Sequence, residues 1–181
     1  VREFPSVPDP IETKFKITAY SEGLNAYNRI GDQNKNWETR VILNGRILLG
    51  FTDEALKIPQ KGFNVIGITN TGDIKLNENY KTNENVDDSN RLVSDAKDLL
   101  KDKSTNLVLF VVHYNAVGKI SNGMYDYLTI LGASKIKNMK KNNSYIFVYD
   151  NVDKIPLFES LESKKINVFH SEGKQPVIDA S

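Results

Sequence analysis

Two histidines, His113 and His170, are the side chains best suited to acid–base chemistry near neutral pH. His113 follows the apolar run Leu107–Val112 and precedes Tyr114 and Asn115. Ligand sites of open α/β sheets gather at strand ends, so this corner is a candidate site. General acid–base catalysis would need a partner carboxylate, and no acid lies close to His113 in the sequence. We therefore prefer the simpler interpretation, a histidine that forms hydrogen bonds at the end of a strand.

Sequence signatures of catalysis and cofactor binding are absent from the chain. It contains neither a P-loop, nor G-x-G-x-x-G, nor a G-x-S-x-G nucleophile elbow. It has no cysteine, which excludes thiol nucleophiles and zinc sites with sulfur ligands, and two histidines are too few for a metal cluster without carboxylates. Scattered acids (Asp53, Glu54, Asp87 and Asp126) are the alternative source of an acid and a base, but their spacing supports no such pair. We therefore expect no catalytic residues, no cofactor and no metal.

The composition also excludes several classes of partner. Lys and Arg number 24 and Asp and Glu 23, so a net charge of +1 gives no electrostatic reason to expect nucleic acid or an acidic membrane surface. The longest apolar run, Leu107–Val112, is far shorter than the ~20 residues that cross a bilayer. A short basic run (Lys135, Lys137, Lys140, Lys141) indicates a solvated loop, with an anion or nucleic-acid site as the alternative. The lack of cysteine favours a cytosolic or virion setting.

Strand patterns are frequent along the chain. Prolines at 5, 8 and 10 predict an extended lead over residues 1–13, and polar and apolar residues then alternate over Lys14–Tyr20. Ser21–Glu38 is polar and predicts a long surface loop that contains Trp37, either a lid over the core or an exposed contact. Thr39–Phe51 predicts a hairpin, because Asn44-Gly45 suits a type I′ turn. Further strands are predicted at Phe63–Thr69, Ile74–Tyr80, Asn106–Val112, Tyr145–Tyr149 and Ile166–Phe169.

Helical periodicity predicts two main helices. The first begins at Asp88 or Ser89, and capping together with the helix dipole explains the Asp87-Asp88 pair better than a cation site does. The second runs from Ser121 to Leu131, with Gly132 as its stop. A short helix is predicted near Leu157–Leu161. The strand Val108–Val112, a helix and the strand Tyr145–Tyr149 together have the pattern of a β-α-β unit. A single α/β domain over residues 14–170, with a tail at 171–181, follows from these elements.

Several short motifs follow one another in a recognisable order. Lys61–Val65 places a glycine before an apolar strand, Thr71-Gly72-Asp73 follows, and Leu131–Ser134 comes after the strand Leu107–Val112. Over roughly Lys14 to Tyr149, this series resembles the GG domain, also called the interleukin-like EMT-inducer or lectin-GG domain. The resemblance implies a compact α/β (α+β) domain in which two sheets are flanked by two main helices.

The GG-domain family includes secreted cytokine-like eukaryotic proteins, the stem domain of the O-mannose N-acetylglucosaminyltransferase, and the distal hinge connector of T-even phage long tail fibres. Lys14-Phe15-Lys16-Ile17 followed by a loop is most similar to the phage members, and the lack of cysteine separates the chain from the secreted ones. The resemblance therefore implies a non-enzymatic structural module of a phage virion, a connector domain of a tail fibre or baseplate whose partners are other tail proteins. A secreted or cytoplasmic location is the alternative.

Some members of that family bind carbohydrate through an acidic pair after the central strand and an arginine before an aromatic-led strand. By resemblance the acidic pair falls on Tyr114 and Asn115, the arginine falls on Asn142, and the aromatic residue is Tyr145. Charged bidentate hydrogen bonds to sugar hydroxyls are thereby lost, but amide hydrogen bonds and ring stacking are still available. The alternative function is therefore binding of host glycans at His113, Tyr114, Asn115, Asn142 and Asn143.

Overall fold

A computed structural model describes residues 14–27 and 37–174. The elements are β1 (Lys14–Ser21), the 3-10 turn η1 (Leu24–Ala26), β2 (Arg40–Leu43), β3 (Arg46–Leu49), β4 (Gly62–Thr69), β5 (Ile74–Tyr80), α1 (Val86–Lys101), β6 (Thr105–His113), α2 (Asn122–Ile130), the 3-10 turn η2 (Ile136–Asn138), β7 (Ser144–Asp150), β8 (Ile155–Glu162) and β9 (Asn167–Lys174). The lead predicted for residues 1–13 and the tail from 175 onwards lie outside the described residues.

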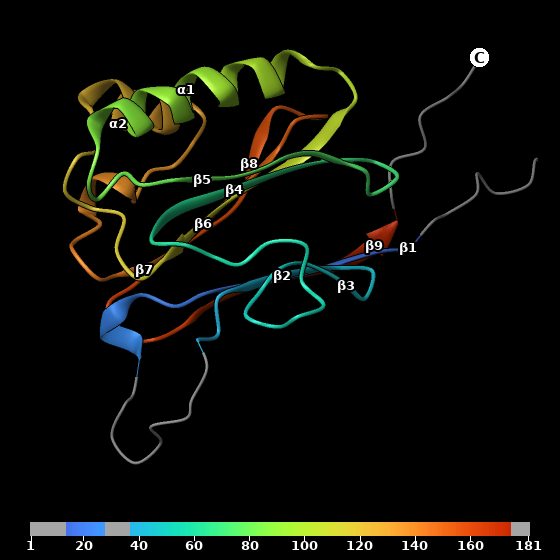
Figure 1. The fold of residues 1–181 in the computed structure, drawn as a ribbon. Coiled ribbons are helices and arrows are strands. Elements are labelled where there is room, and N and C mark those ends of the chain that lie inside the picture. Colours follow the sequence, from blue (N-terminus) through green and yellow to red (C-terminus); the bar gives the residue numbers. More distant parts are fainter. Residues whose placement is uncertain (1–13, 28–36, 175–181) are drawn as a thin grey trace, which may run out of the picture.

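Three layers make up the fold. A four-stranded sheet has the order β3-β2-β1-β9, and a five-stranded sheet has the order β5-β4-β6-β7-β8. Helices α1 and α2 cover one face of the large sheet, and the small sheet lies against the other (Figure 1). The central strands β4 and β6 are buried along their whole lengths because both of their faces are covered. The predicted class, a domain of two sheets with two main helices, is confirmed.

The predicted hairpin is formed by β2 and β3. Asn44 has φ 51° and Gly45 has φ 82°, the positive values that a type I′ turn needs at both central positions. Leu43 pairs with Arg46 directly across the turn. The hairpin predicted from the Asn44-Gly45 turn is thus confirmed.

Both main helices form, with one corrected boundary. Helix α1 is capped by Asn85, whose side chain accepts hydrogen bonds from the amides of Asp87 and Asp88, so neither Asp88 nor Ser89 is the cap. The acid pair lies in the first turn, where the helix dipole favours it. Helix α2 is capped by Ser121, and the chain turns away at Gly132 with φ 111°, as predicted.

Two predictions near the C-terminal end are wrong. The segment Leu157–Leu161 belongs to strand β8 and not to a helix, because its backbone pairs antiparallel with β7. Strands β6 and β7 are also antiparallel, so they do not form a β-α-β unit with parallel strands. The connection through α2 leaves and re-enters the large sheet at the same end, where the Asn142 amide donates to Asn115 Oδ1 at 3.4 Å. The last strand, β9, extends to Lys174, beyond the strand predicted for residues 166–169 and into the predicted tail.

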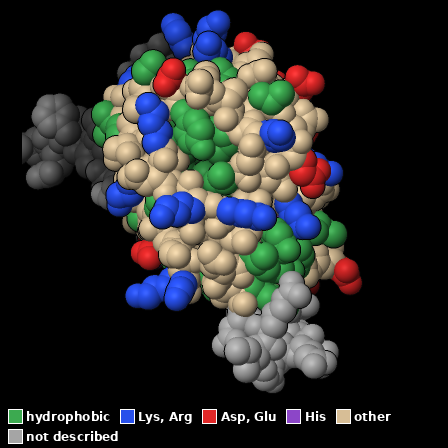
Figure 2. Space-filling view, turned by 90° about the vertical axis from the view of Figure 1, so that its left-hand side faces the viewer, with side chains coloured by type: hydrophobic (Ala, Val, Ile, Leu, Met, Phe, Trp, Pro, Cys, Tyr) green, Lys and Arg blue, Asp and Glu red, His purple; other side chains and the backbone are tan. Residues whose placement is uncertain are grey.

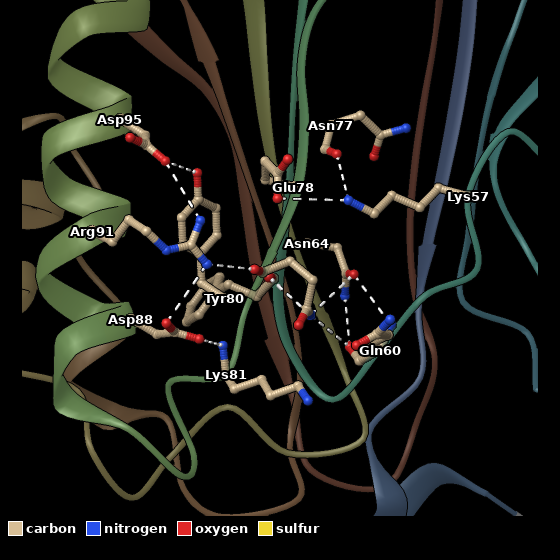
Figure 3. A network of polar contacts seen from close by, with 12 residues as sticks. Lys57, Gln60, Asn64, Asn77, Glu78, Tyr80, Lys81, Asp88, Arg91 and Asp95 are labelled. Atoms are coloured by element: carbon tan, nitrogen blue, oxygen red, sulfur yellow. Dashed lines mark hydrogen bonds and ion pairs between the residues drawn. The ribbon is translucent and has the colours of Figure 1, made fainter.

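Helix α1 is fixed to the edge strand β5 by a polar clamp that centres on Tyr80 (Figure 3). The Tyr80 hydroxyl donates to Asp95 Oδ2 at 2.7 Å, and the Arg91 guanidinium lies 4.3 Å from the centre of the Tyr80 ring. Arg91 also donates to the Asn79 carbonyl at 3.0 Å. Burial and the hydrogen bond to Asp95 raise the pKa of Tyr80 above its ordinary value, so the phenol is the permanent donor of this pair.

Removal of the hydroxyl in Tyr80→Phe is expected to lower the free energy of unfolding by about 1 kcal/mol, because one hydrogen bond to a charged acceptor is lost while the ring remains. Urea denaturation measures the change. The matched control is Tyr20→Phe, since the Tyr20 ring also lies beneath an arginine, at 4.2 Å from Arg40, but its hydroxyl has no hydrogen bond in the described chain. An equal loss in both variants would contradict the role of the Asp95 contact.

Candidate functional site

The five predicted site residues meet at one end of the large sheet. His113 is the last residue of β6, Tyr114 and Asn115 follow it, and Asn142 and Asn143 precede β7. Tyr114 and Asn142 both have left-handed backbones, with φ 65° and 68°. The corner predicted from the sequence therefore exists as a cluster of neighbouring residues, and the contacts of each member decide what it can do.

His113 is a structural residue by its geometry. Its side chain is buried, with 4% of its surface exposed, and Nδ1 lies 2.8 Å from the hydroxyl oxygen of Thr39. The rings of Trp37 and Phe51 lie 5.0 and 5.1 Å from the imidazole. Burial, and after it the positive charge of Lys61, lower the pKa of His113 from 6.5 to about 4, so the ring is neutral at pH 7. The geometry agrees with the interpretation of a hydrogen-bonding histidine at a strand end.

The asparagines of the cluster shape the loops that carry them. The side chains of Asn115 and Asn143 are buried. Asn115 Oδ1 accepts the Val117 amide at 3.0 Å, and Asn143 Oδ1 accepts the Lys140 amide at 2.8 Å. Such short-range side-chain to backbone bonds stabilise turns. The side-chain oxygens of Asn115 and Asn143 are therefore occupied by the protein itself.

The segment that follows β1 packs into this cluster. The Tyr114 amide donates to the Glu22 carbonyl at 3.0 Å, and the Leu24 amide donates to the Tyr114 carbonyl at 2.9 Å. The Asn25 amide donates to the Asn142 carbonyl at 3.1 Å. Backbone atoms of two predicted site residues thus hold η1 in place. The left-handed backbones of Tyr114 and Asn142 direct their carbonyl groups toward η1.

Buried hydroxyls complete the connection between the two sheets. Ser21 Oγ donates to the Val112 carbonyl at 2.5 Å and accepts the Tyr145 amide at 3.0 Å. Ser144 Oγ accepts the Gly23 amide at 2.8 Å. We call this network the sheet junction, and its members are Ser21, Glu22, Gly23, Thr39, His113 and Ser144. All six are buried.

The sheet junction was missed in the sequence because Ser21–Glu38 is polar and predicts a surface loop. Ser21, Glu22 and Gly23 are instead fully enclosed. A Cβ on Gly23 would lie 2.4 Å from the Asn142 carbonyl oxygen, so only glycine fits there. No pattern in the sequence distinguishes such a buried polar segment from a solvated one.

A cavity of about 310 Å³ opens beside the cluster. It is lined by Pro59, Gln60, Lys61, Lys81, Glu84 and His113. The ring of Tyr114 is partly exposed, and Lys61 Nζ lies 4.3 Å from its centre. Lys and Arg side chains cross this end of the molecule in a row at mid-height (Figure 2). Among the residues around the cavity, Gln60, Lys61, Lys81 and Glu84 are exposed and Tyr114 is partly exposed, so a ligand could reach these side chains.

The other candidate residues do not form a reaction centre. Asp53 and Glu54 lie in the loop after β3, Asp87 begins α1, and Asp126 on α2 lies 3.6 Å from Lys137 in an ion pair. Among the described residues, no group of three His, Cys, Asp or Glu side chains could hold a metal ion. The four lysines of the basic run, Lys135, Lys137, Lys140 and Lys141, are exposed, as a solvated loop requires.

Comparison with known proteins identifies one family. Residues 61–151, just over half of the chain, match the sequence model of the interleukin-like EMT inducer family. The matched segment runs from the start of β4 to the end of β7 and includes both helices and the cavity-lining residues Lys61, Lys81 and His113. No curated protein sequence matches the chain. Within residues 14–27 and 37–174, no helix is long and apolar enough to span a membrane.

Proposed function

The chain belongs to the interleukin-like EMT inducer family, the GG-domain family, and from this premise we propose that it is a non-enzymatic interaction module, a connector domain of a bacteriophage tail fibre or baseplate. The observation that carries the proposal is the sheet junction. At the candidate corner, His113 Nδ1 and the Oδ1 atoms of Asn115 and Asn143 are hydrogen-bonded within the protein. Asn142 Oδ1 is buried and has no hydrogen bond in the described part of the chain.

The sheet junction suits a rigid body that transmits position between attached parts. It joins β1 and Thr39, the residue before β2, to β6 and β7 of the large sheet by buried hydrogen bonds. Buried hydrogen bonds are costly to break, because each buried donor or acceptor left unpaired lowers the stability by about 1–3 kcal/mol. The two sheets consequently move as one unit, which a connector requires.

The virion setting rests on two features of the sequence. The opening Lys14-Phe15-Lys16-Ile17 and its following loop are similar to the phage members of the family, and the chain is free of cysteine. In this role its partners are other tail proteins. Mass spectrometry of purified virions from the parent phage is the direct test: peptides of the chain at a stoichiometric level are expected, and virions free of them would overturn the assignment.

Carbohydrate binding is the second candidate function. The observation that favours it is the partly exposed Tyr114 ring next to the cavity of about 310 Å³. Tyrosine rings stack on sugars, and Lys61, Lys81 and Gln60 supply donors at the cavity rim. His113, Asn115 and Asn143 would act only as supports, since their side chains are buried.

A glycan array distinguishes the two functions, and the connector role predicts that the folded chain binds no glycan on it. The matched variant is Tyr114→Asn, which removes the ring, while asparagine tolerates the backbone φ of 65° better than most residues. Thermal melting verifies that wild type and variant are both folded. Glycan binding by the wild type that Tyr114→Asn reduces at least tenfold would replace the connector role with a lectin role.

A further inference from the structure

Four strands lie at the edges of the two sheets, and three of them are protected against pairing with another chain. The edges are β3 and β9 in the small sheet and β5 and β8 in the large sheet. An edge strand offers unpaired backbone N–H and C=O groups, and natural proteins cover, bend or interrupt such edges. The contacts of each edge show which of these devices it uses.

A loop and long side chains cover the edges of β3 and β5. The Leu56 amide donates to the Ile47 carbonyl at 3.1 Å, so the loop after β3 folds back along that strand. On β5, Lys57 Nζ donates to the Asn77 carbonyl at 2.8 Å, and Arg91 donates to the Asn79 carbonyl at 3.0 Å (Figure 3). The carbonyls of Ile47, Asn77 and Asn79 on these two edges therefore have partners within the chain.

Strand β8 is interrupted rather than covered. Val148 pairs with Phe158 and Tyr149 pairs with Pro156, so Leu157 is the extra residue of a β-bulge. Pro156 has no N–H to offer, and a bulge bends the strand away from regular pairing. This edge is a poor template for another strand.

Within residues 14–27 and 37–174, strand β9 shows none of these devices. It pairs with β1 over eight residues without a register shift, from Asn167 opposite Ser21 to Lys174 opposite Lys14. It contains no proline. The side chains of Val168, His170 and Glu172 are exposed, at about half of their surface. β9 is thus a long and regular strand at the outside of the small sheet.

The direction of each backbone group on β9 follows from the register. The Asn44 amide donates to the Lys16 carbonyl at 2.7 Å, so the backbone of Lys16 faces β2. Successive residues of a strand alternate, and the backbones of Ile17 and Ala19 therefore face β9. Their partners Ser171 and Phe169 face β1 in return.

Val168, His170 and Glu172 consequently direct their N–H and C=O groups to the free edge. The side-chain contact between Thr18 Oγ1 and His170 Nδ1, at 2.8 Å, agrees with a pair that exchanges no backbone bonds, where side chains approach closely. In the described part of the chain, no hydrogen bond reaches these outward groups. Strand β9 therefore forms backbone hydrogen bonds with β1 on one side, and its other side is available to another strand.

We propose that β9 is a homodimerisation edge, to which β9 of a second copy of this chain adds antiparallel. Residues whose backbone groups point to the free edge must pair with residues of the same kind in the second copy. A two-fold axis at Ser171 satisfies this condition, and it places His170 of each copy opposite Glu172 of the other. His170 and Glu172 lie on the same face of the sheet, where they are 3.8 Å apart within one copy, and an imidazole and a carboxylate can also form a hydrogen bond between the two copies. The two small sheets then form one continuous eight-stranded sheet.

Sedimentation equilibrium of the full chain tests the dimer. The wild type is expected to dimerise at micromolar concentration. His170→Pro removes an N–H that has no partner in the described part of the chain. The fold is therefore expected to be kept, while the dissociation constant of the dimer rises at least about 100-fold. His170→Ala is the matched control, because it removes the same side chain but keeps the N–H, and it remains dimeric.

Three results would overturn the proposal: a wild type that is monomeric at about 100 µM, a folded His170→Pro variant as dimeric as wild type, or a His170→Ala variant as monomeric as His170→Pro. If His170→Pro fails to fold, Glu172→Pro repeats the test at the next outward N–H, with Glu172→Ala as its control. The proposed connector role does not depend on the result, since a monomeric chain binding a different tail protein would still fulfil it.

Discussion

Gly62→Ala will lower the free energy of unfolding by at least about 3 kcal/mol. Gly62 opens strand β4 with φ 106°, a backbone conformation that disfavours every residue with a Cβ. A Cβ at this position would also lie 2.2 Å from the Tyr80 carbonyl oxygen, which belongs to the neighbouring strand and cannot rotate away. Chemical denaturation measures the loss, and a large fraction of the variant is expected to be unfolded or insoluble at 37 °C.

The control for Gly62 is Gly45→Ala in the β2–β3 turn. Gly45 has φ 82°, but nothing lies within 4 Å of a Cβ built there. This variant reports the backbone penalty alone, about 1 kcal/mol. If both variants lost the same free energy, the contact with Tyr80 would have no energetic weight, and the close approach of β4 and β5 at Gly62 would be dispensable.

Acidification will destabilise the protein through His113. The folded state holds the pKa of this histidine at about 4, while the unfolded chain returns it to about 6.5. Between these values the unfolded chain binds a proton that the folded protein does not, so stability falls as the pH drops from about 6.5 to about 4. The loss attributable to this group amounts to about 3 kcal/mol.

His113→Asn is the variant that isolates this effect. It is less stable than wild type at pH 7, because ring contacts with Trp37 and Phe51 are lost, but its stability changes less between pH 6.5 and 4. His170→Asn is the control for a histidine-to-asparagine change away from His113, at an exposed position on strand β9. An unchanged pH slope in His113→Asn would show that His113 does not titrate within this window.

Features of the fold encoded by a few adjacent residues were predictable. Asn44-Gly45 indicated the hairpin, and Ser121 with Gly132 delimited α2, because turn and cap chemistry depends on local backbone conformation. The Leu157 and Leu161 spacing resembled a helical period, but Leu157 is the bulge residue of an edge strand. The antiparallel arrangement of β6 and β7 was not predictable, since a helix between two strands does not determine at which end the chain re-enters the sheet.

The location of the candidate site was predictable from the sequence, but the burial of its side chains was not. Strand ends and the family resemblance pointed to His113, Tyr114 and Asn142, and the structure brings these residues together. Burial of the His113 side chain depends on Thr39 and Trp37, which approach from a segment separated by about 75 residues in sequence, and no local pattern encodes that contact.

The pairing of β1 with β9 has a mechanical consequence. Lys14 lies opposite Lys174, so the two ends of the described domain leave side by side from the same end of the small sheet. A pulling force applied through both ends would load the β1–β9 hydrogen bonds one after another and unzip them, whereas a sheared pair shares the load over all its bonds. A connector that bears tension would therefore be loaded through its faces or through one end and a bound partner, because loading through both ends opens the β1–β9 pair first.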